Sequence, residues 1–210
     1  MAVVVKICGI TNLEDALAAV GFGADALGFV FHETSPRSVS IENAARISQK
    51  LPPHIVKVGV FVDAPEETVL RAIAACGLNV LQFHGGESPE YCCQFGLMSV
   101  KAFRMRDAAS LEELPRYPTD AWLLDSYVED KPGGTGKKFN WELAREAQRL
   151  GRPIFLAGGL THENVADAVR LVKPYAVDVS SGVEASPGKK DLKKLKAFIE
   201  AAKHFDQEAQ

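Results

Sequence analysis

The fold is decided by a pattern that appears first in the stretch VVVKICGIT, at residues 3–11. A β-branched run ends in a single cysteine, Cys8, followed by a glycine. Thr11 and Glu14 have the spacing of a capping box, which predicts a helix that starts just after the strand. A thiol between a strand end and a helix N-terminus lies in a positive field that favours the thiolate. Cys8 is therefore a candidate reactive thiol, although most free cysteines are simply small buried hydrophobes.

The same strand-then-helix pattern recurs along the whole chain. Eight apolar, β-branched runs are each followed by a helical pattern, and they lie at residues 3–8, 26–31, 56–62, 80–84, 99–103, 121–125, 153–157 and 176–180. Near-continuous apolar strands that alternate with helices predict a parallel sheet covered by helices. Eight such units, spaced by about 25 residues, fit an α/β fold of the (β/α)8 TIM-barrel type. An open doubly wound sheet is the main rival, but its Gly-x-Gly-x-x-Gly turn is missing after the first run.

Several helix starts and the domain organisation also follow from the sequence. Asp63, Ser88 and Thr161 are the expected helix caps, the last of them before a helix over residues 162–172. No linker or low-complexity segment interrupts the pattern, so residues 1–210 are expected to form a single domain. The polar tail at residues 204–210 is expected to fray.

Charge and cysteine content argue against several classes of protein. The 210 residues include 24 Lys plus Arg and 27 Asp plus Glu, and a formal net charge of -3 gives no signal for nucleic acid or an anionic membrane. The first residues do not read as a signal peptide, and no apolar run is long enough to span a bilayer. The four cysteines show neither CxxC spacing nor a disulfide framework, so no metal is expected. These features predict a cytoplasmic protein.

Polar and glycine residues concentrate at the carboxyl ends of the predicted strands, where barrel enzymes place their active sites. Gly158 and Gly159 follow the seventh strand, whereas Ser180, Ser181 and Gly182 follow the eighth. Glycines let backbone N–H groups approach an anion closely, and serine hydroxyls add donors. Because barrel enzymes frequently bind phosphate with these two loops, the sequence predicts a phosphate site rather than only tight turns.

Another glycine-rich segment lies in the long stretch 126–138 that follows the sixth strand. Its sequence GGTGK, at residues 133–137, lacks the Walker A spacing, so nucleotide hydrolysis is not indicated. Its length and glycine content predict a mobile lid, in which Gly134 is a further candidate phosphate ligand.

As a set, these motifs resemble those of the phosphoribosylanthranilate isomerase family. The matching segments cover nearly the whole chain in order and are KICGIT at 6–11, SPR at 35–37, LQFHG at 81–85, LDS at 124–126, GGTG at 133–136, FNW at 139–141, LAGGL at 156–160 and DVSSGVE at 178–184. The resemblance implies an Amadori rearrangement of N-(5-phosphoribosyl)anthranilate to 1-(2-carboxyphenylamino)-1-deoxyribulose 5-phosphate, a step of tryptophan biosynthesis. It implies neither a metal nor an organic cofactor.

The resemblance also implies one general acid and one general base. On this resemblance, Asp125 is expected to be the acid that protonates the ribose ring oxygen, and Cys8 the base that removes the proton from C2′. Asp125 ends the apolar run 121–124, so partial burial is expected to raise its pKa and keep protonated acid available. Without the motif set, a capping or loop-tying role is the more ordinary one for such an aspartate.

Four further residues are expected to bind the substrate. The resemblance implies that Arg37 binds the anthranilate carboxylate, which suits its planar guanidinium, and a solvated loop arginine is the alternative. Gln82 and His84 share an inward parity at the end of the fourth strand, and Asp178 has inward parity on the eighth, where it is expected to bind ribose hydroxyls. These last three are equally compatible with satisfied polar residues in the top layer of a barrel.

Two other functions fit parts of the sequence. An indole-glycerol-phosphate synthase would share the phosphate site, but it requires a catalytic lysine inside the barrel, where Lys6 has the right parity, and an N-terminal extension, which is not expected here. A non-catalytic barrel that binds a phosphorylated ligand would have no reason to retain both Cys8 and Asp125. The expected partner is a small phosphorylated substrate, and the oligomeric state stays open between monomer and homodimer.

Overall fold

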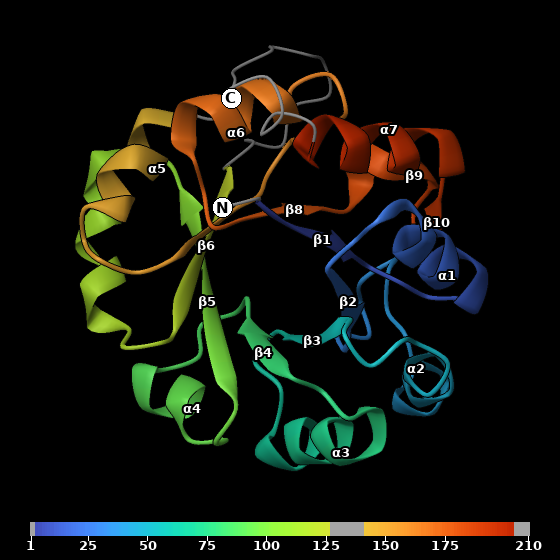
Figure 1. Ribbon diagram of the computed structural model, residues 1–210. Helices are drawn as coiled ribbons and strands as arrows, with labels where there is room; N and C mark the ends of the chain where they lie inside the picture. Colours follow the sequence, from blue (N-terminus) through green and yellow to red (C-terminus); the bar gives the residue numbers. More distant parts are fainter. Residues whose placement is uncertain (1–2, 127–140, 204–210) are drawn as a thin grey trace.

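The computed structural model describes residues 3–126 and 141–203. Eight strands pair in parallel, each with the next along the chain, and β8 closes the sheet against β1 (Figure 1). They are β1 (Val4–Cys8), β2 (Ala26–Val30), β3 (Val56–Phe61), β4 (Val80–Phe83), β5 (Met98–Met105), β6 (Ala121–Ser126), β7 (Ile154–Leu156) and β8 (Ala176–Val179). Each strand lies where an apolar run predicts it, with ends that differ by at most two residues. The predicted (β/α)8 barrel is confirmed.

Helices form a ring around the outside of the barrel (Figure 1). They are α1 (Leu13–Phe22), α2 (Ile41–Ser48), α3 (Glu66–Cys76), α4 (Pro89–Cys93), α5 (Trp141–Gln148), α6 (Val165–Val172) and α7 (Leu192–Lys203). Two short 3-10 helices, η1 (Ala108–Glu112) and η2 (Leu114–Arg116), connect β5 to β6. After β8 come a third, η3 (Ser181–Val183), and an antiparallel hairpin of β9 (Glu184–Ser186) and β10 (Lys189–Lys190).

The start of α1 is displaced by one residue from its predicted cap. The Asn12 side chain caps the helix, because its Oδ1 accepts a hydrogen bond from the backbone N–H of Asp15 at 2.8 Å. The hydroxyl of Thr11 instead donates to the carbonyl oxygen of Gly188, 2.5 Å away. Thr11 therefore ties the loop after β1 to the β9–β10 hairpin, a long-range contact that the local capping pattern does not encode.

Of the other predicted helix starts, one is confirmed and two are wrong. Ser88 caps α4 as predicted. Asp63 does not cap α3, because its carboxylate accepts a hydrogen bond from the backbone N–H of Gly86 at 2.7 Å. Helix α6 begins at Val165 rather than at residue 162, because a turn follows Thr161.

Alternation along the strands divides the core into two layers. One layer packs the strands against the helices and includes large side chains such as Ile7, Phe29 and Phe83. The other fills the barrel interior with mostly small side chains, namely Cys8, Ala26, Val58, Val60, Val80, Val100, Ala102, Ala121, Leu123 and Ala157. Side chains with this second parity at the carboxyl ends of the strands therefore reach the mouth of the barrel.

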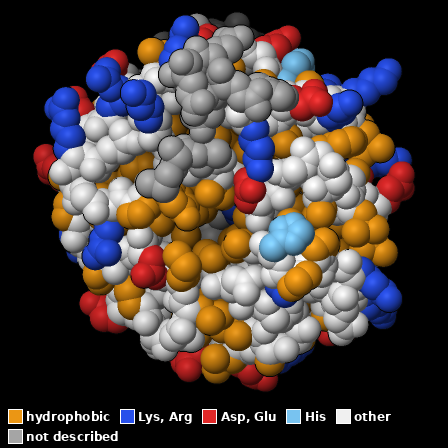
Figure 2. All heavy atoms as spheres, in the orientation of Figure 1, with side chains coloured by type: hydrophobic (Ala, Val, Ile, Leu, Met, Phe, Trp, Pro, Cys, Tyr) orange, Lys and Arg blue, Asp and Glu red, His pale blue; other side chains and the backbone are white. Residues whose placement is uncertain are grey.

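Figure 2 shows positive and negative side chains interspersed around the rim of the face in view. Within the described residues, no helix combines the length and the apolar character needed to cross a membrane. The predicted lid beyond Ser126 and the predicted frayed tail at 204–210 lie outside the described residues.

Candidate active site

A cavity of about 320 Å³ lies at the carboxyl ends of the strands. It is lined by every predicted site residue that the structure describes: Cys8, Arg37, Gln82, His84, Asp125, Gly158, Gly159, Asp178, Ser180, Ser181 and Gly182. The remaining candidate, Gly134, lies outside the described residues. Closure of the barrel thus brings together side chains from both ends of the sequence.

Cys8 is the last residue of β1 and is only 8% exposed. Burial raises the pKa of its thiol, against the opposing effect of the ammonium groups of Lys6 and Lys190. The net direction is therefore opposite to the one that the helix field alone would give. Helix α1 begins only at Leu13, and because the helix dipole weakens beyond the first turn, the loss of solvation dominates.

Lys6 lies on the same face of β1 as Cys8 and is completely buried. Its Nζ donates a hydrogen bond to Asp178 Oδ1 on the neighbouring strand β8, at 2.8 Å. A Cβ atom on Gly28 would lie 2.9 Å from Cys8 Sγ and 3.2 Å from Lys6 Nζ, so the thiol and the ammonium border the same small space. Burial lowers the pKa of Lys6, but Asp178 and Cys8 outweigh it and the pKa is raised. A stable cation therefore lies beside the thiol.

Asp125 lies at the mouth with its side chain 31% exposed. The His84 Nε2 atom is 3.5 Å from Asp125 Oδ2, and the His84 Nδ1 atom is 3.4 Å from Gln82 Nε2. An amide nitrogen only donates, so this orientation of Gln82 makes Nδ1 the acceptor and leaves the imidazole hydrogen on Nε2, toward Asp125. The Gln82 Oε1 atom is buried without a hydrogen-bond partner among the described residues.

The loops after β7 and β8 approach one another closely. Gly158 and Gly159 have φ values of 79° and 67°, a left-handed conformation that favours glycine. A Cβ atom on Gly182 would collide with the carbonyl oxygen of Leu160, so only glycine fits there. The backbone N–H groups of Gly158 and Gly159 make no hydrogen bond to another described residue. With Ser181 beside them, these groups have the chemistry of an anion site.

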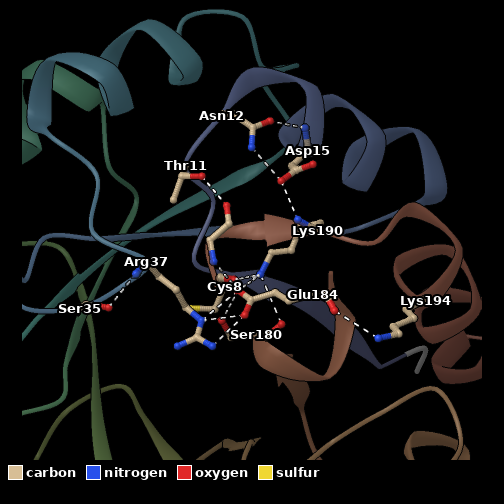
Figure 3. Close-up of polar contacts among 11 residues, drawn as sticks. Cys8, Thr11, Asn12, Asp15, Ser35, Arg37, Ser180, Glu184, Lys190 and Lys194 are labelled. Carbon is tan, nitrogen blue, oxygen red and sulfur yellow. Dashed lines mark hydrogen bonds and ion pairs between the residues drawn. The ribbon is translucent and has the colours of Figure 1, made fainter. Parts of the chain in front are cut away.

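Arg37 is held by Glu184, which is not among the site residues predicted from the sequence. Its Nε lies 2.9 and 3.1 Å from the two carboxylate oxygens of Glu184, and its Nη2 lies 2.8 Å from Glu184 Oε2 (Figure 3). Lys190, also missed, places its Nζ 3.1 Å from Glu184 Oε1. Glu184 is the last residue of the DVSSGVE motif, so the motif could have indicated it as a site residue. Lys190 belongs to no such motif.

The described residues contain no group of three or more His, Cys, Asp and Glu side chains arranged to hold a metal ion. The chemistry available in the cavity is that of a thiol, an imidazole, carboxylates and cations. A closed (β/α)8 barrel with such groups at the carboxyl ends of its strands has the architecture of a barrel enzyme.

Comparison with known proteins identifies the family. Residues 5–201 match the family model described as N-(5'phosphoribosyl)anthranilate (PRA) isomerase, so the chain belongs to that family. The N-(5'-phosphoribosyl)anthranilate isomerase of Pelobacter propionicus is 53% identical over 205 residues, which are 98% of each chain.

Solved structures agree with this assignment. One is a phosphoribosyl anthranilate isomerase in complex with reduced 1-(o-carboxyphenylamino)-1-deoxyribulose 5-phosphate, with a TM-score of 0.87. Another is described as monomers of the dimeric isomerase from Thermotoga maritima, with a TM-score of 0.85. Each is 44% identical to this chain, and each comparison covers 95% of this chain and 98% of the other.

Proposed function

We propose that this chain isomerises N-(5'-phosphoribosyl)anthranilate with Asp125 as general acid and Cys8 as general base. The reaction follows from membership of the isomerase family, and it is a step of tryptophan biosynthesis. The assignment of roles is supported by one observation above all: both side chains line the same cavity. A non-catalytic ligand-binding barrel would need neither of them.

The first step requires a proton on the ring oxygen of the ribose. Asp125 donates it, the furanose ring opens, and an iminium ion forms at C1′. The His84 Nε2 atom, 3.5 Å from Asp125 Oδ2, is placed to orient the carboxyl group and to stabilise the carboxylate that forms. Gln82 holds His84 in this orientation through Nδ1.

The second step requires a base for the C2′ proton. Cys8 must be ionised to accept it, and Lys6 and Lys190 are the cations that oppose the effect of burial on its pKa. Proton removal gives an enolamine, which tautomerises to the ketone product. Lys6 is engaged by Asp178, so this arrangement gives it the role of a neighbouring cation rather than that of the catalytic lysine of a lyase.

Two anionic groups of the substrate hold it across the barrel mouth. We assign its phosphate to the backbone of Gly158, Gly159, Ser181 and Gly182, with Ser180 beside them. We assign its anthranilate carboxylate to Arg37 and its ribose hydroxyls to Asp178, and Gln82 lines the cavity beside them. A crystal grown with phosphate or sulfate tests the first assignment, and an anion found elsewhere with these loops empty would contradict it.

The decisive experiment is steady-state isomerisation of freshly made phosphoribosylanthranilate, followed by its anthranilate fluorescence. Cys8→Ser removes the ionisable thiol with little change of shape, and Asp125→Asn removes the acidic proton. Each variant should lose kcat by roughly 10²–10⁴-fold, with KM little changed. A folded Cys8→Ser protein whose kcat stays within about threefold of the parent would overturn the base assignment.

The remaining expectations concern the surroundings of the enzyme. We propose a cytoplasmic location and a monomeric or homodimeric state, and light scattering of the purified chain decides between the two states. The relative from Thermotoga maritima described as dimeric makes the homodimer a concrete alternative.

A further inference from the structure

Behind one wall of the cavity, a charged cluster joins four segments of the chain. Its members are Arg37, Glu184 and Lys190, with the backbone of Cys8 and Ser180 beside them (Figure 3). Arg37 lines the cavity, whereas Glu184 and Lys190 are not among its lining residues. The side chains of Glu184 and Lys190 are 5% and 0% exposed, so neither serves mainly to contact solvent.

Glu184 restrains the guanidinium of Arg37 along one edge. Three contacts of 2.8 to 3.1 Å involve Nε and Nη2, and Nη1 makes no hydrogen bond to another described residue. Paired contacts of this kind define the plane of a guanidinium as well as its position. The N–H groups not used by Glu184 are therefore held ready for an anion in the cavity.

Lys190 extends the same cluster to the base. Its Nζ donates to the carbonyl oxygen of Cys8 at 2.6 Å, to that of Ser180 at 3.4 Å, and to Glu184 Oε1 at 3.1 Å. Its backbone N–H donates to Asp15 Oδ2 at 2.8 Å, which anchors the lysine to α1. Lys190 thus bridges the ends of the neighbouring strands β1 and β8.

The charges in the cluster favour one kind of ligand. Arg37 and Lys190 are two cations around a single carboxylate, so the cluster retains one unit of positive charge. Without Glu184 the cations would repel one another, and Arg37 would lose the contacts that orient it. With Glu184, the positive charge that remains is carried by an oriented guanidinium.

We propose that Glu184 is a positioning residue that holds Arg37 for the substrate carboxylate and, through Lys190, keeps it in a fixed relation to Cys8. This inference rests on the proposed function, in which Arg37 binds the carboxylate and Cys8 is the base. It assigns the β9–β10 hairpin the task of setting the distance between the group that recognises the anthranilate and the group that performs the chemistry.

A double-mutant cycle on the isomerisation reaction tests the inference. Glu184→Gln keeps the size of the side chain and removes its charge, and we expect KM to rise roughly tenfold, the scale of one charge-assisted hydrogen bond. In an Arg37→Ala background the same substitution should change KM by less than about twofold, because residues that act through one another are not additive. Lys190→Met should lower kcat more than it raises KM. Glu200→Gln on the exposed face of α7 is the matched control and should change neither.

Each outcome decides the question. Equal effects of Glu184→Gln on KM in the parent and in the Arg37→Ala background would overturn the inference and leave the proposed function intact. A parent protein without isomerase activity would instead overturn the proposed function. If circular dichroism shows that Glu184→Gln is unfolded, Glu184→Asp takes its place in the same cycle. Aspartate keeps the charge but is one methylene shorter, so its penalty should also vanish without Arg37.

Discussion

Two buried lysine–carboxylate pairs in this barrel have nearly the same nitrogen–oxygen distance and are buried to a similar degree. Lys6 Nζ lies 2.8 Å from Asp178 Oδ1, with side chains 0% and 9% exposed. Lys101 Nζ lies 2.9 Å from Glu87 Oε2, with side chains 3% and 2% exposed. Both pairs join neighbouring parts of the barrel, yet their surroundings give them different tasks.

The Lys101–Glu87 pair, here called the closed pair, makes several further hydrogen bonds to neighbouring backbone groups. Glu87 also accepts hydrogen bonds from the backbone N–H groups of Asp63 and Gly85, both at 2.9 Å, and Lys101 also donates to the carbonyl oxygen of Gly85 at 2.6 Å. The pair therefore ties the loop after β3 to the loop after β4. Few hydrogen-bonding groups of the pair are left for a ligand, so we infer that its role is structural.

The Lys6–Asp178 pair, here called the open pair, faces the cavity through Asp178. Asp178 lines the cavity, and Lys6 borders the same space as the Cys8 thiol. Burial and ion pairing therefore do not by themselves mark a functional site. What distinguishes the two pairs is how fully their polar atoms are already hydrogen-bonded to other described residues.

Breaking the closed pair should give the largest change in stability. Lys101→Met leaves the Glu87 carboxylate buried without its cation, and we expect the free energy of unfolding to fall by about 3–5 kcal/mol. Denaturant unfolding measures this loss. Arg170→Ala, in a pair whose side chains are both 56% exposed, is the control and should cost less than about 1 kcal/mol. A similarly small loss for Lys101→Met would show that the Lys101–Glu87 pair is not a structural tie.

A substitution among the residues that line the cavity should change substrate binding rather than stability. Arg37→Ala removes a charge-assisted contact to the carboxylate, and we expect KM to rise by an amount equivalent to roughly 1.5–3 kcal/mol of binding free energy. The affinity for inorganic phosphate should hardly change, because that anion is assigned to other loops. Steady-state kinetics and phosphate inhibition measure the two effects separately. An unchanged KM would return Arg37 to the role of a loop arginine.

Removing the cation of the open pair should change the reactivity of Cys8. Lys6 opposes the rise in the pKa of the thiol, so Lys6→Met should raise that pKa further. Each pKa unit corresponds to about 1.4 kcal/mol and lowers the thiolate fraction about tenfold at neutral pH. The rate of Cys8 alkylation, followed by mass spectrometry across pH, reports the shift, and the exposed Cys93 serves as an internal reference. Alkylation of Cys8 at the parental rate would show that Lys6 does not act on the thiol.

The sequence predicts the fold well because apolar periodicity is a local property. Each strand is recognisable within its own run, and the parity along β4 and β8 correctly directs Gln82 and Asp178 toward the barrel mouth. Local patterns fail where a distant segment competes for the same group. Thr11 has a plausible capping partner in Glu14, but the carbonyl oxygen of Gly188 takes its hydroxyl.

The site was predictable where its residues stand at strand ends and hidden where they act through the closed barrel. Lys190 donates a hydrogen bond to the carbonyl oxygen of Cys8, which is 182 residues away in the sequence. No local sequence motif around Lys190 predicts that contact. The direction of the Cys8 pKa shift was missed for a related reason. The helix dipole can be inferred from the local sequence, whereas the loss of solvation depends on how the whole barrel packs around the thiol.

The ion pair between the partly exposed Arg37 and the buried Glu184 should give the smallest effect, visible in the acid dependence of stability. Burial raises the pKa of Glu184, but the hydrogen bonds and charges of Arg37 and Lys190 outweigh it, so the pKa lies below its ordinary value of 4.5. A carboxyl group with a lowered folded-state pKa stabilises the fold above its unfolded-state pKa, and this stabilisation is lost as the pH falls through the folded-state value. The difference in unfolding free energy between the parent and Glu184→Gln should therefore be constant above about pH 5.5 and shrink below pH 4.5, by less than about 1 kcal/mol. Urea unfolding at stepped pH values, with Glu200→Gln as control, measures the change. A difference that stays constant down to the acid transition would mean that Glu184 is not held as an ion pair in the native state.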